Sequence, residues 1–235
     1  MKTATTIAMT LMATCVALTI PGIAGAVILG QLDDFEDGTT QAWEEGFVSP
    51  NPPVNVSDGG PTGLGDNYLE LVSSGGLGAG SRQVAFNLLQ WTGDYVGGGV
   101  TAIEADMANF GASAVSLRIA IQDGSGTRFG STVSVSLPAD GVWHPVSFGV
   151  KPADLTSIIG AASAEAALSN VIQFRIMVAA VGPAWEGDVI VSTLGVDNIN
   201  AVTDPPQVPS LSGWSFAVLG AGLLLVAVRR GLLGS

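Results

Sequence analysis

The sequence has few of the residues that several function classes require. Its 235 residues include one cysteine, one histidine and eight lysines and arginines, and only 12% are charged. Because Cys15 is the single cysteine, no intrachain disulfide can staple the fold. The scarcity of basic residues argues against a nucleic-acid-binding surface. An apolar content of 47% excludes a disordered acidic chain.

The charge that is present is concentrated in the middle of the chain. Residues 27–207 carry all twenty acidic residues and five of the eight basic ones, a net charge of −15, while both ends are apolar. This distribution excludes a multi-span transporter and indicates one acidic domain between two hydrophobic segments. Glycine is abundant at 32 residues, roughly twice the average usage, which favours tight turns.

The first segment, residues 1–26, has the pattern of a secretory signal peptide. Lys2 precedes an uncharged apolar stretch, and Ala24-Gly25-Ala26 provides the small residues of a cleavage site after Ala26. The alternatives are a retained anchor and lipidation at Cys15.

The last segment predicts a membrane helix. Residues 203–209 form a proline-rich linker, which cannot pair in a sheet. In residues 210–235, an uncharged run from Trp214 to Val228 ends at Arg229 and Arg230. Fifteen helical residues reach about 22 Å against a hydrocarbon core of roughly 30 Å, so flanking residues must complete the span. The arginine pair would stay cytoplasmic and leave the domain outside.

The same segment resembles C-terminal sorting signals of the PEP-CTERM type, in the variant that opens Ile-Pro-Thr-Leu-Ser-Glu-Trp. Gly213 replaces the acid of that motif. The resemblance implies export to the cell surface, outer membrane or extracellular matrix of a Gram-negative bacterium, transient membrane retention, and cleavage by an exosortase-type transpeptidase. A permanent anchor is the alternative. The residues that carry the resemblance are Val208, Pro209, Ser210, Leu211, Ser212, Trp214, Arg229 and Arg230.

The domain between these ends, residues 27–202, reads as an antiparallel β-sandwich. Residues 115–122 and 171–178 alternate apolar and polar side chains, as half-buried strands do. Glycine- and proline-rich turns separate further β-rich segments. One interruption, residues 154–168, is alanine-rich and predicts a short helix. The other expected strands are 101–107, 132–137, 143–150 and 188–199.

Its ends resemble those of jelly-roll modules of the carbohydrate-binding and galactose-binding-like families. The residues that carry the resemblance are the opening Asp33-Asp34-Phe35-Glu36-Asp37-Gly38, which leads to Trp43, and the closing Leu194-Gly195-Val196-Asp197-Asn198-Ile199. The resemblance implies a jelly roll whose first and last strands often hold a structural calcium ion. Calcium takes oxygen ligands, and the acids that could converge if the two ends pair are Asp34, Glu36, Asp66 and Asp197. Solvated turn acids are the alternative.

Aromatic side chains in glycine-flanked loops are candidates for sugar contacts, because an aromatic ring stacks on the apolar face of a sugar. Trp91, Tyr95 and Trp185 lie beside acidic residues in such loops, although core packing is the commoner role of rings in a sandwich. Trp43 and Trp143 lie in strand context and are expected in the core.

No catalytic motif is present. His144 precedes a proline without a nucleophile motif around it, and twenty acids make any carboxylate pair uninformative. If a carboxylate pair worked here, Glu70, Glu104 and Asp106 are the places to look. We therefore expect a non-enzymatic exported surface protein that binds extracellular polysaccharide. The alternatives are a polysaccharide hydrolase or lyase on the same sandwich, and a purely structural surface component.

Overall fold

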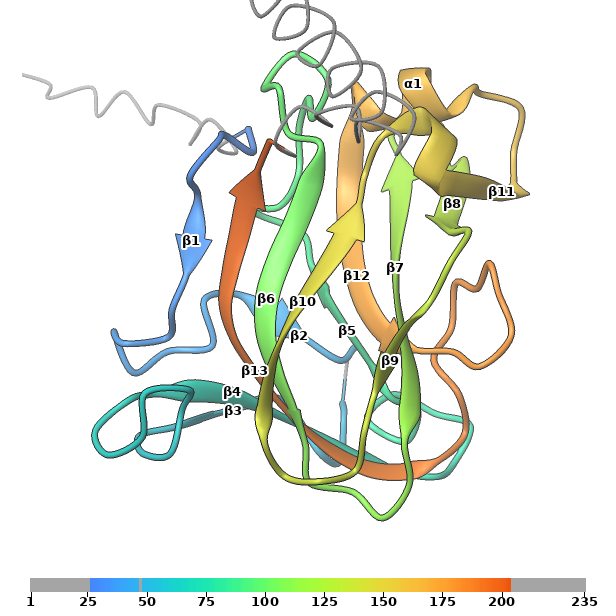
Figure 1. The fold of residues 1–235 in the computed structure, drawn as a ribbon. Coiled ribbons are helices and arrows are strands. Elements are labelled where there is room, and N and C mark those ends of the chain that lie inside the picture. The colour runs from blue at the N-terminus through green and yellow to red at the C-terminus, as the bar shows by residue number, and fades with distance from the viewer. Residues whose placement is uncertain (1–25, 47, 204–235) are drawn as a thin grey trace, which may run out of the picture.

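A computed structural model describes residues 26–46 and 48–203, which form two antiparallel sheets packed face to face (Figure 1). The predicted β-sandwich is therefore confirmed. The predicted signal peptide, the end of the linker and the sorting segment lie outside the described residues. Within the described part, no helix is both long and apolar enough to span a membrane.

The first sheet contains the opening and closing strands of the domain, side by side (Figure 1). Leu32 of β1 pairs with Asn200 of β13, and Asp33 with Ile199, so the two ends pair, which is the condition for their acidic residues to converge. The strands in order are β10 (Trp143–Gly149), β6 (Ala102–Asn109), β13 (Val191–Val202), β4 (Tyr68–Ser74) and β3 (Val54–Val56), with β1 (Leu32–Asp33) also against β13.

The second sheet carries the two strands with the clearest alternation, β7 and β12, at its centre. The strands in order are β11 (Leu155–Ile159), β8 (Arg128–Ser131), β7 (Val115–Asp123), β12 (Val171–Val178), β5 (Val84–Asn87) and β2 (Trp43–Glu44), with β9 (Val135–Leu137) also against β7.

The expected helix over 154–168 is only partly correct. A 3-10 turn, η1 (Pro152–Asp154), leads into strand β11, and the helix α1 is confined to Ala164–Leu168. Residues 155–159 contain three β-branched residues and pair with β8, because β-branched side chains suit a pleated surface. The Ser163 hydroxyl caps α1 by accepting a hydrogen bond from the backbone N–H of Ala166.

The core between the sheets is built around a buried carboxyl group. Asp33 Oδ2 accepts hydrogen bonds from the indole N–H of Trp43 at 2.8 Å and of Trp91 at 2.6 Å. Burial raises the pKa of Asp33, while these hydrogen bonds act in the opposite direction. Trp43 and Trp91 both contact the ring of Phe174. The expectation that Trp43 is a core residue is confirmed.

Candidate functional site

Arginines project from the outer face of the second sheet, and small residues lie between them. Arg118, Arg128 and Arg175 alternate along their strands with core residues, so their side chains leave the sheet on the outer side. Ala120 pairs with both Gly130 and Arg175, which leaves a shallow surface between the arginines.

The segment between β12 and β13 folds back over this surface. A Cβ added at Gly130 would lie 3.1 Å from the carbonyl oxygen of Ala184 and 3.2 Å from Pro183 Cβ. A Cβ added at Gly187 would overlap the backbone of Gln83. Glycine at both positions therefore lets residues 180–188 approach the sheet closely.

Trp185 is the sequence-predicted aromatic that lies on this surface. It is partly buried, and its ring centroid lies 4.3 Å from the guanidinium carbon of Arg128 and 3.8 Å from that of Arg175. Arg175 also donates a hydrogen bond to the Trp185 carbonyl oxygen at 2.8 Å. The ring is thus fixed in place by two cation–π contacts.

Beside Trp185 lies a pocket of about 230 Å³ between this segment and the loop that precedes β5. Phe86 supplies its aromatic ring, and the ring also lies 5.4 Å from the guanidinium carbon of Arg175. The pocket is lined by Glu45, Gly46, Leu77, Gly78, Ala79, Arg82, Val84, Phe86, Arg175 and Glu186.

Two polar groups of this pocket lack hydrogen-bond partners among the described residues. Glu45 is only 4% exposed, yet neither of its carboxyl oxygens is bonded, and the Nε of Arg175 is unbonded as well. Burial raises the pKa of Glu45 to about 8. Burial also lowers the pKa of Arg175 to about 10, with a smaller contribution from Arg128. Unsatisfied buried groups of this kind are unusual in native structures and call for a partner.

Two of the three predicted sugar contacts must be corrected. Trp91 and Tyr95 are 0% exposed and belong to the core, so neither ring is available to a ligand in this structure. Trp91 is held there by its hydrogen bond to Asp33, and Tyr95 donates to the Trp91 carbonyl oxygen at 2.9 Å. The flanking acids and glycines are typical of a surface loop, but both rings point into the core.

Trp143, expected in the core, is instead partly exposed on the outer face of the first sheet. Its ring packs against Tyr68 and Phe110 and covers Gly195. Its indole N–H donates to the Gly59 carbonyl oxygen at 3.0 Å. The prediction for Trp143 is therefore wrong, because β10 places it on the solvent side of the strand.

Three of the four predicted calcium ligands lie close enough to one another to interact electrostatically. Asp197 is 1% exposed, and its pKa is raised to about 7, first by burial and then by the charges of Asp66, Asp106 and Glu36. Asp34 instead accepts a hydrogen bond from the Glu36 backbone N–H at 3.3 Å. Within residues 26–46 and 48–203, no group of three or more His, Cys, Asp or Glu side chains has an arrangement that could hold a metal ion. The acids approach one another without forming a closed ligand set.

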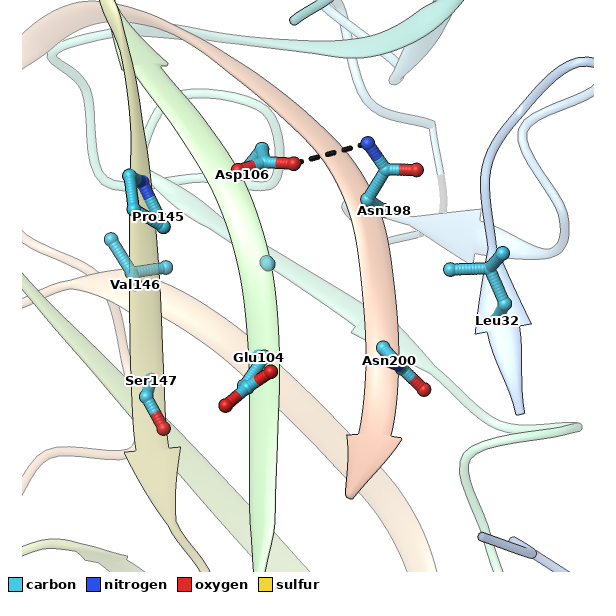
Figure 2. Close-up of a pocket in the computed structure, with 9 residues that line it drawn as sticks. Leu32, Glu104, Asp106, Pro145, Val146, Ser147, Asn198 and Asn200 are labelled. Atoms are coloured by element: carbon cyan, nitrogen blue, oxygen red, sulfur yellow. Dashed lines mark hydrogen bonds between the residues drawn. The ribbon is translucent and has the colours of Figure 1, made fainter. Parts of the chain in front are cut away.

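A second pocket, of about 470 Å³, lies on the outer face of the first sheet (Figure 2). Glu104 and Asp106 stand two residues apart on β6, and the Asn198 side-chain amide donates to Asp106 Oδ2 at 3.1 Å. Asn198 has a positive φ of 51° at the point where the pairing of β13 with β6 shifts register. His144, on β10, lies 3.0 Å from Asp140 Oδ2 at the surface.

Comparisons with known proteins show a shared fold. No known family model matches the chain, and no curated protein matches it. Among solved structures, an exo-β-agarase is similar with a TM-score of 0.57 and 14% identity over 77% of this chain, which corresponds to 25% of the agarase chain. A family 11 carbohydrate-binding module from Clostridium thermocellum, in complex with a β-1,3-1,4-mixed-linked tetrasaccharide, has a TM-score of 0.47 and 16% identity over 76% of this chain and 97% of its own. A family 28 module specific for non-crystalline cellulose has a TM-score of 0.47 and 15% identity over 76% and 95%.

Sequence reasoning missed Glu45, Phe86 and Arg175. The alternation around Arg175 indicated that it faces outward, but nothing in the sequence pairs it with residues 45 and 86. Only the neighbouring positions of β2, β5 and β12 in the sheet bring them together.

Proposed function

We propose that this domain binds polysaccharide in the pocket on the outer face of its second sheet. The observation that carries the proposal is the lining of this pocket, which brings the Phe86 ring together with the side chains of Arg82 and Arg175. The unbonded oxygens of Glu45 and the Nε of Arg175 are closed to solvent in this structure, so a hydroxyl-rich ligand would accept from the guanidinium groups that line the pocket, because a hydroxyl both donates and accepts.

The apolar part of the pocket suits the same ligand. Phe86 is partly exposed, and Leu77 and Val84 extend its apolar surface. A sugar ring presents C–H groups on its faces and hydroxyls at its rim, so it can stack on Phe86 while its hydroxyls reach Arg82 and Arg175. An aromatic contact of this type contributes about 0.5–1.5 kcal/mol beyond the area that it buries.

The test is binding of the full chain to a panel of neutral and acidic polysaccharides, followed by titration calorimetry and by tryptophan fluorescence, since the Trp185 ring contacts Arg175, which lines the pocket. Replacing Phe86 by Ala should weaken binding about tenfold, the equivalent of about 1.4 kcal/mol. Phe110→Ala is the matched control, because Phe110 is a partly exposed ring on the other sheet, 41% exposed. Equal losses in the two variants, or no binding to any polysaccharide, would count against this site, and the latter would favour a purely structural role.

We propose that the domain does not cleave its ligand. The full chain should release no new reducing ends from any polysaccharide that it binds. The hydrolase alternative would use the Glu104 and Asp106 pair beside the 470 Å³ pocket. Release of reducing ends that disappears in a Glu104→Gln, Asp106→Asn double variant would establish that alternative.

We further propose that calcium binds beside Asp197. The support is the buried carboxyl itself, faced by three like charges that a divalent cation would offset. Calcium added to the chelator-treated full chain should raise its melting temperature, since a ligand at a hundred times its Kd stabilises by about 2.7 kcal/mol. Asp197→Asn should abolish the increase, whereas Asp94→Asn, at an exposed loop acid, should retain it. An unchanged melting curve with and without calcium would refute the site.

We propose, on the sequence features of the two ends, that the protein is exported and then sorted through residues 208–235. The bacterial surface or extracellular matrix is the expected destination, with the membrane and an exosortase-type transpeptidase as partners in transit.

A further inference from the structure

Positive charge gathers on one face of this acidic domain. Of the five basic residues between positions 26 and 203, four are arginines of the second sheet or its border. Arg118, Arg128 and Arg175 leave its outer face from β7, β8 and β12, and Arg82 lines the pocket before β5. Lys151, the fifth, stands at the start of η1. Arg118 is buried and donates to the carbonyl oxygens of Ala179 and Ser131, so the accessible positive charge of this face comes from the other three arginines. Two of these, Arg82 and Arg175, line the pocket.

The acidic groups on this face offset part of that charge at pH 7. Glu186 forms an ion pair with Arg82 at 3.3 Å. Burial raises the pKa of Glu45 to about 8, so its carboxyl is mostly protonated at pH 7 and does not repel an anion. Glu44 is exposed beside Phe86 in the pairing of β2 with β5. Among the described residues, neither Arg128 nor Arg175 forms an ion pair with a carboxylate.

We propose that the pocket recognises the anionic group of an acidic sugar, a carboxylate or a sulfate ester, through Arg175. The inference rests on the proposed function, because the sugar ring itself is held at Phe86. A guanidinium donates in a planar fork that matches carboxylate and sulfate oxygens, and Arg175 lines the pocket together with a second arginine, Arg82.

The overall charge of the protein makes this binding selective. The net charge of −12 repels polyanions at long range, so non-specific adsorption of an acidic polysaccharide is disfavoured. Binding that is observed must come from the local arginines, and it should weaken as salt screens them.

The test uses the full chain with polygalacturonate as the carboxylate probe, dextran sulfate as the sulfate probe, and agarose and hydroxyethylcellulose as neutral probes. At least one acidic probe should bind more tightly than both neutral ones, and affinity should fall as sodium chloride rises from about 50 to about 500 mM. Arg175→Gln should weaken this binding about tenfold or more, because it removes one charge-assisted bidentate contact.

A charge-only variant keeps the test independent of folding, since Arg175 also holds the Trp185 carbonyl. Glu186 has a side chain 63% exposed, and Glu186→Gln removes a negative charge beside the pocket without opening the core. It should tighten binding of the acidic probe about threefold, in keeping with the modest strength of partly exposed ion pairs. Glu165→Gln removes the same charge from the exposed side of α1 and should change nothing.

Three results would overturn the inference in distinguishable ways. Tight binding to a neutral probe alone, lost in Phe86→Ala and insensitive to Glu186→Gln, would leave the proposed function standing and remove the acidic specificity. Binding to none of the four probes would remove both. Binding to an acidic probe that survives in both Arg175→Gln and Arg82→Gln would place the anion elsewhere and refute this site.

Discussion

At the scale of single residues, two buried carboxyl groups link the stability of the domain to its chemistry. Glu45 is buried without a hydrogen-bond partner among the described residues, and Asp197 is buried among other acids. The pKa of Glu45 is raised to about 8 and that of Asp197 to about 7, both well above the usual range of a carboxyl. Neither raised pKa stabilises the folded state at neutral pH. Such shifts are typical of groups that bind a ligand or an ion.

The raised pKa of Glu45 makes stability fall with pH. Between the ordinary pKa of a glutamate, about 4.5, and the raised pKa of about 8, the folded state binds the proton more tightly than the unfolded state. The free energy of unfolding therefore decreases as pH rises through this window, by at most about 1.4 kcal/mol per pH unit from this group, and levels off above it.

Glu45→Gln should remove this contribution, so the variant should gain stability relative to the natural protein between pH 5 and pH 8. Urea denaturation at pH 5, 6.5 and 8 measures the difference. Glu186→Gln, at an exposed position, should show the same pH dependence as the natural protein. Parallel curves for Glu45→Gln and the natural protein would mean that Glu45 titrates normally.

At the scale of secondary-structure elements, the strongest alternation identified the two strands at the centre of the second sheet. β7 and β12 were predictable because a half-buried strand exposes every second residue. β8 (Arg128–Ser131) was missed, because Gly130 and Ser131 weaken its pattern and it is defined by pairing with β7 and β11. The segment over residues 180–188 was equally unpredictable, because its path depends on glycines that let it lie on the second sheet.

Gly187→Ala should therefore loosen this segment. A Cβ at this position would lie 2.6 Å from the Gln83 carbonyl carbon, and overpacking of this kind costs about 1–3 kcal/mol. The melting temperature should fall, and binding at the neighbouring pocket should weaken. Gly78→Ala is the control for stability, since a Cβ there meets nothing within 4 Å. Equal melting temperatures for the two variants would show that the segment adjusts without cost.

At the scale of the whole molecule, charge and hydropathy distinguish two apolar ends from the acidic domain between them. The positive mean hydropathy of +0.47 reflects the two apolar ends together with an acidic domain rich in small and apolar residues. Within that domain, four arginines lie on or beside the second sheet, whereas acidic residues lie on both sheets, with Asp106 and Asp197 on the first and Glu44 and Asp123 on the second.

Processing of the ends is open to a direct measurement. The mass of the mature protein isolated from its own cells should correspond to a chain that starts at Val27 and ends before the apolar run at 214–228. Replacing Pro209 and Trp214 by Ala should leave the C-terminal segment attached, whereas Pro206→Ala should not. A natural protein that retains residues 210–235 would instead support a permanent anchor.

The sequence by itself determined the all-β class, the two strands with the clearest alternation, β7 and β12, and the core position of Trp43. These features follow from the local composition and from the spacing of apolar residues, both of which can be read directly from the sequence. Only the tertiary structure decided that Trp91 and Tyr95 face inward, that Trp143 faces outward and that Glu45, Phe86 and Arg175 share a pocket. The reason is physical: a side chain's face depends on strand register, and residues distant in sequence become neighbours only through pairing across the sheet.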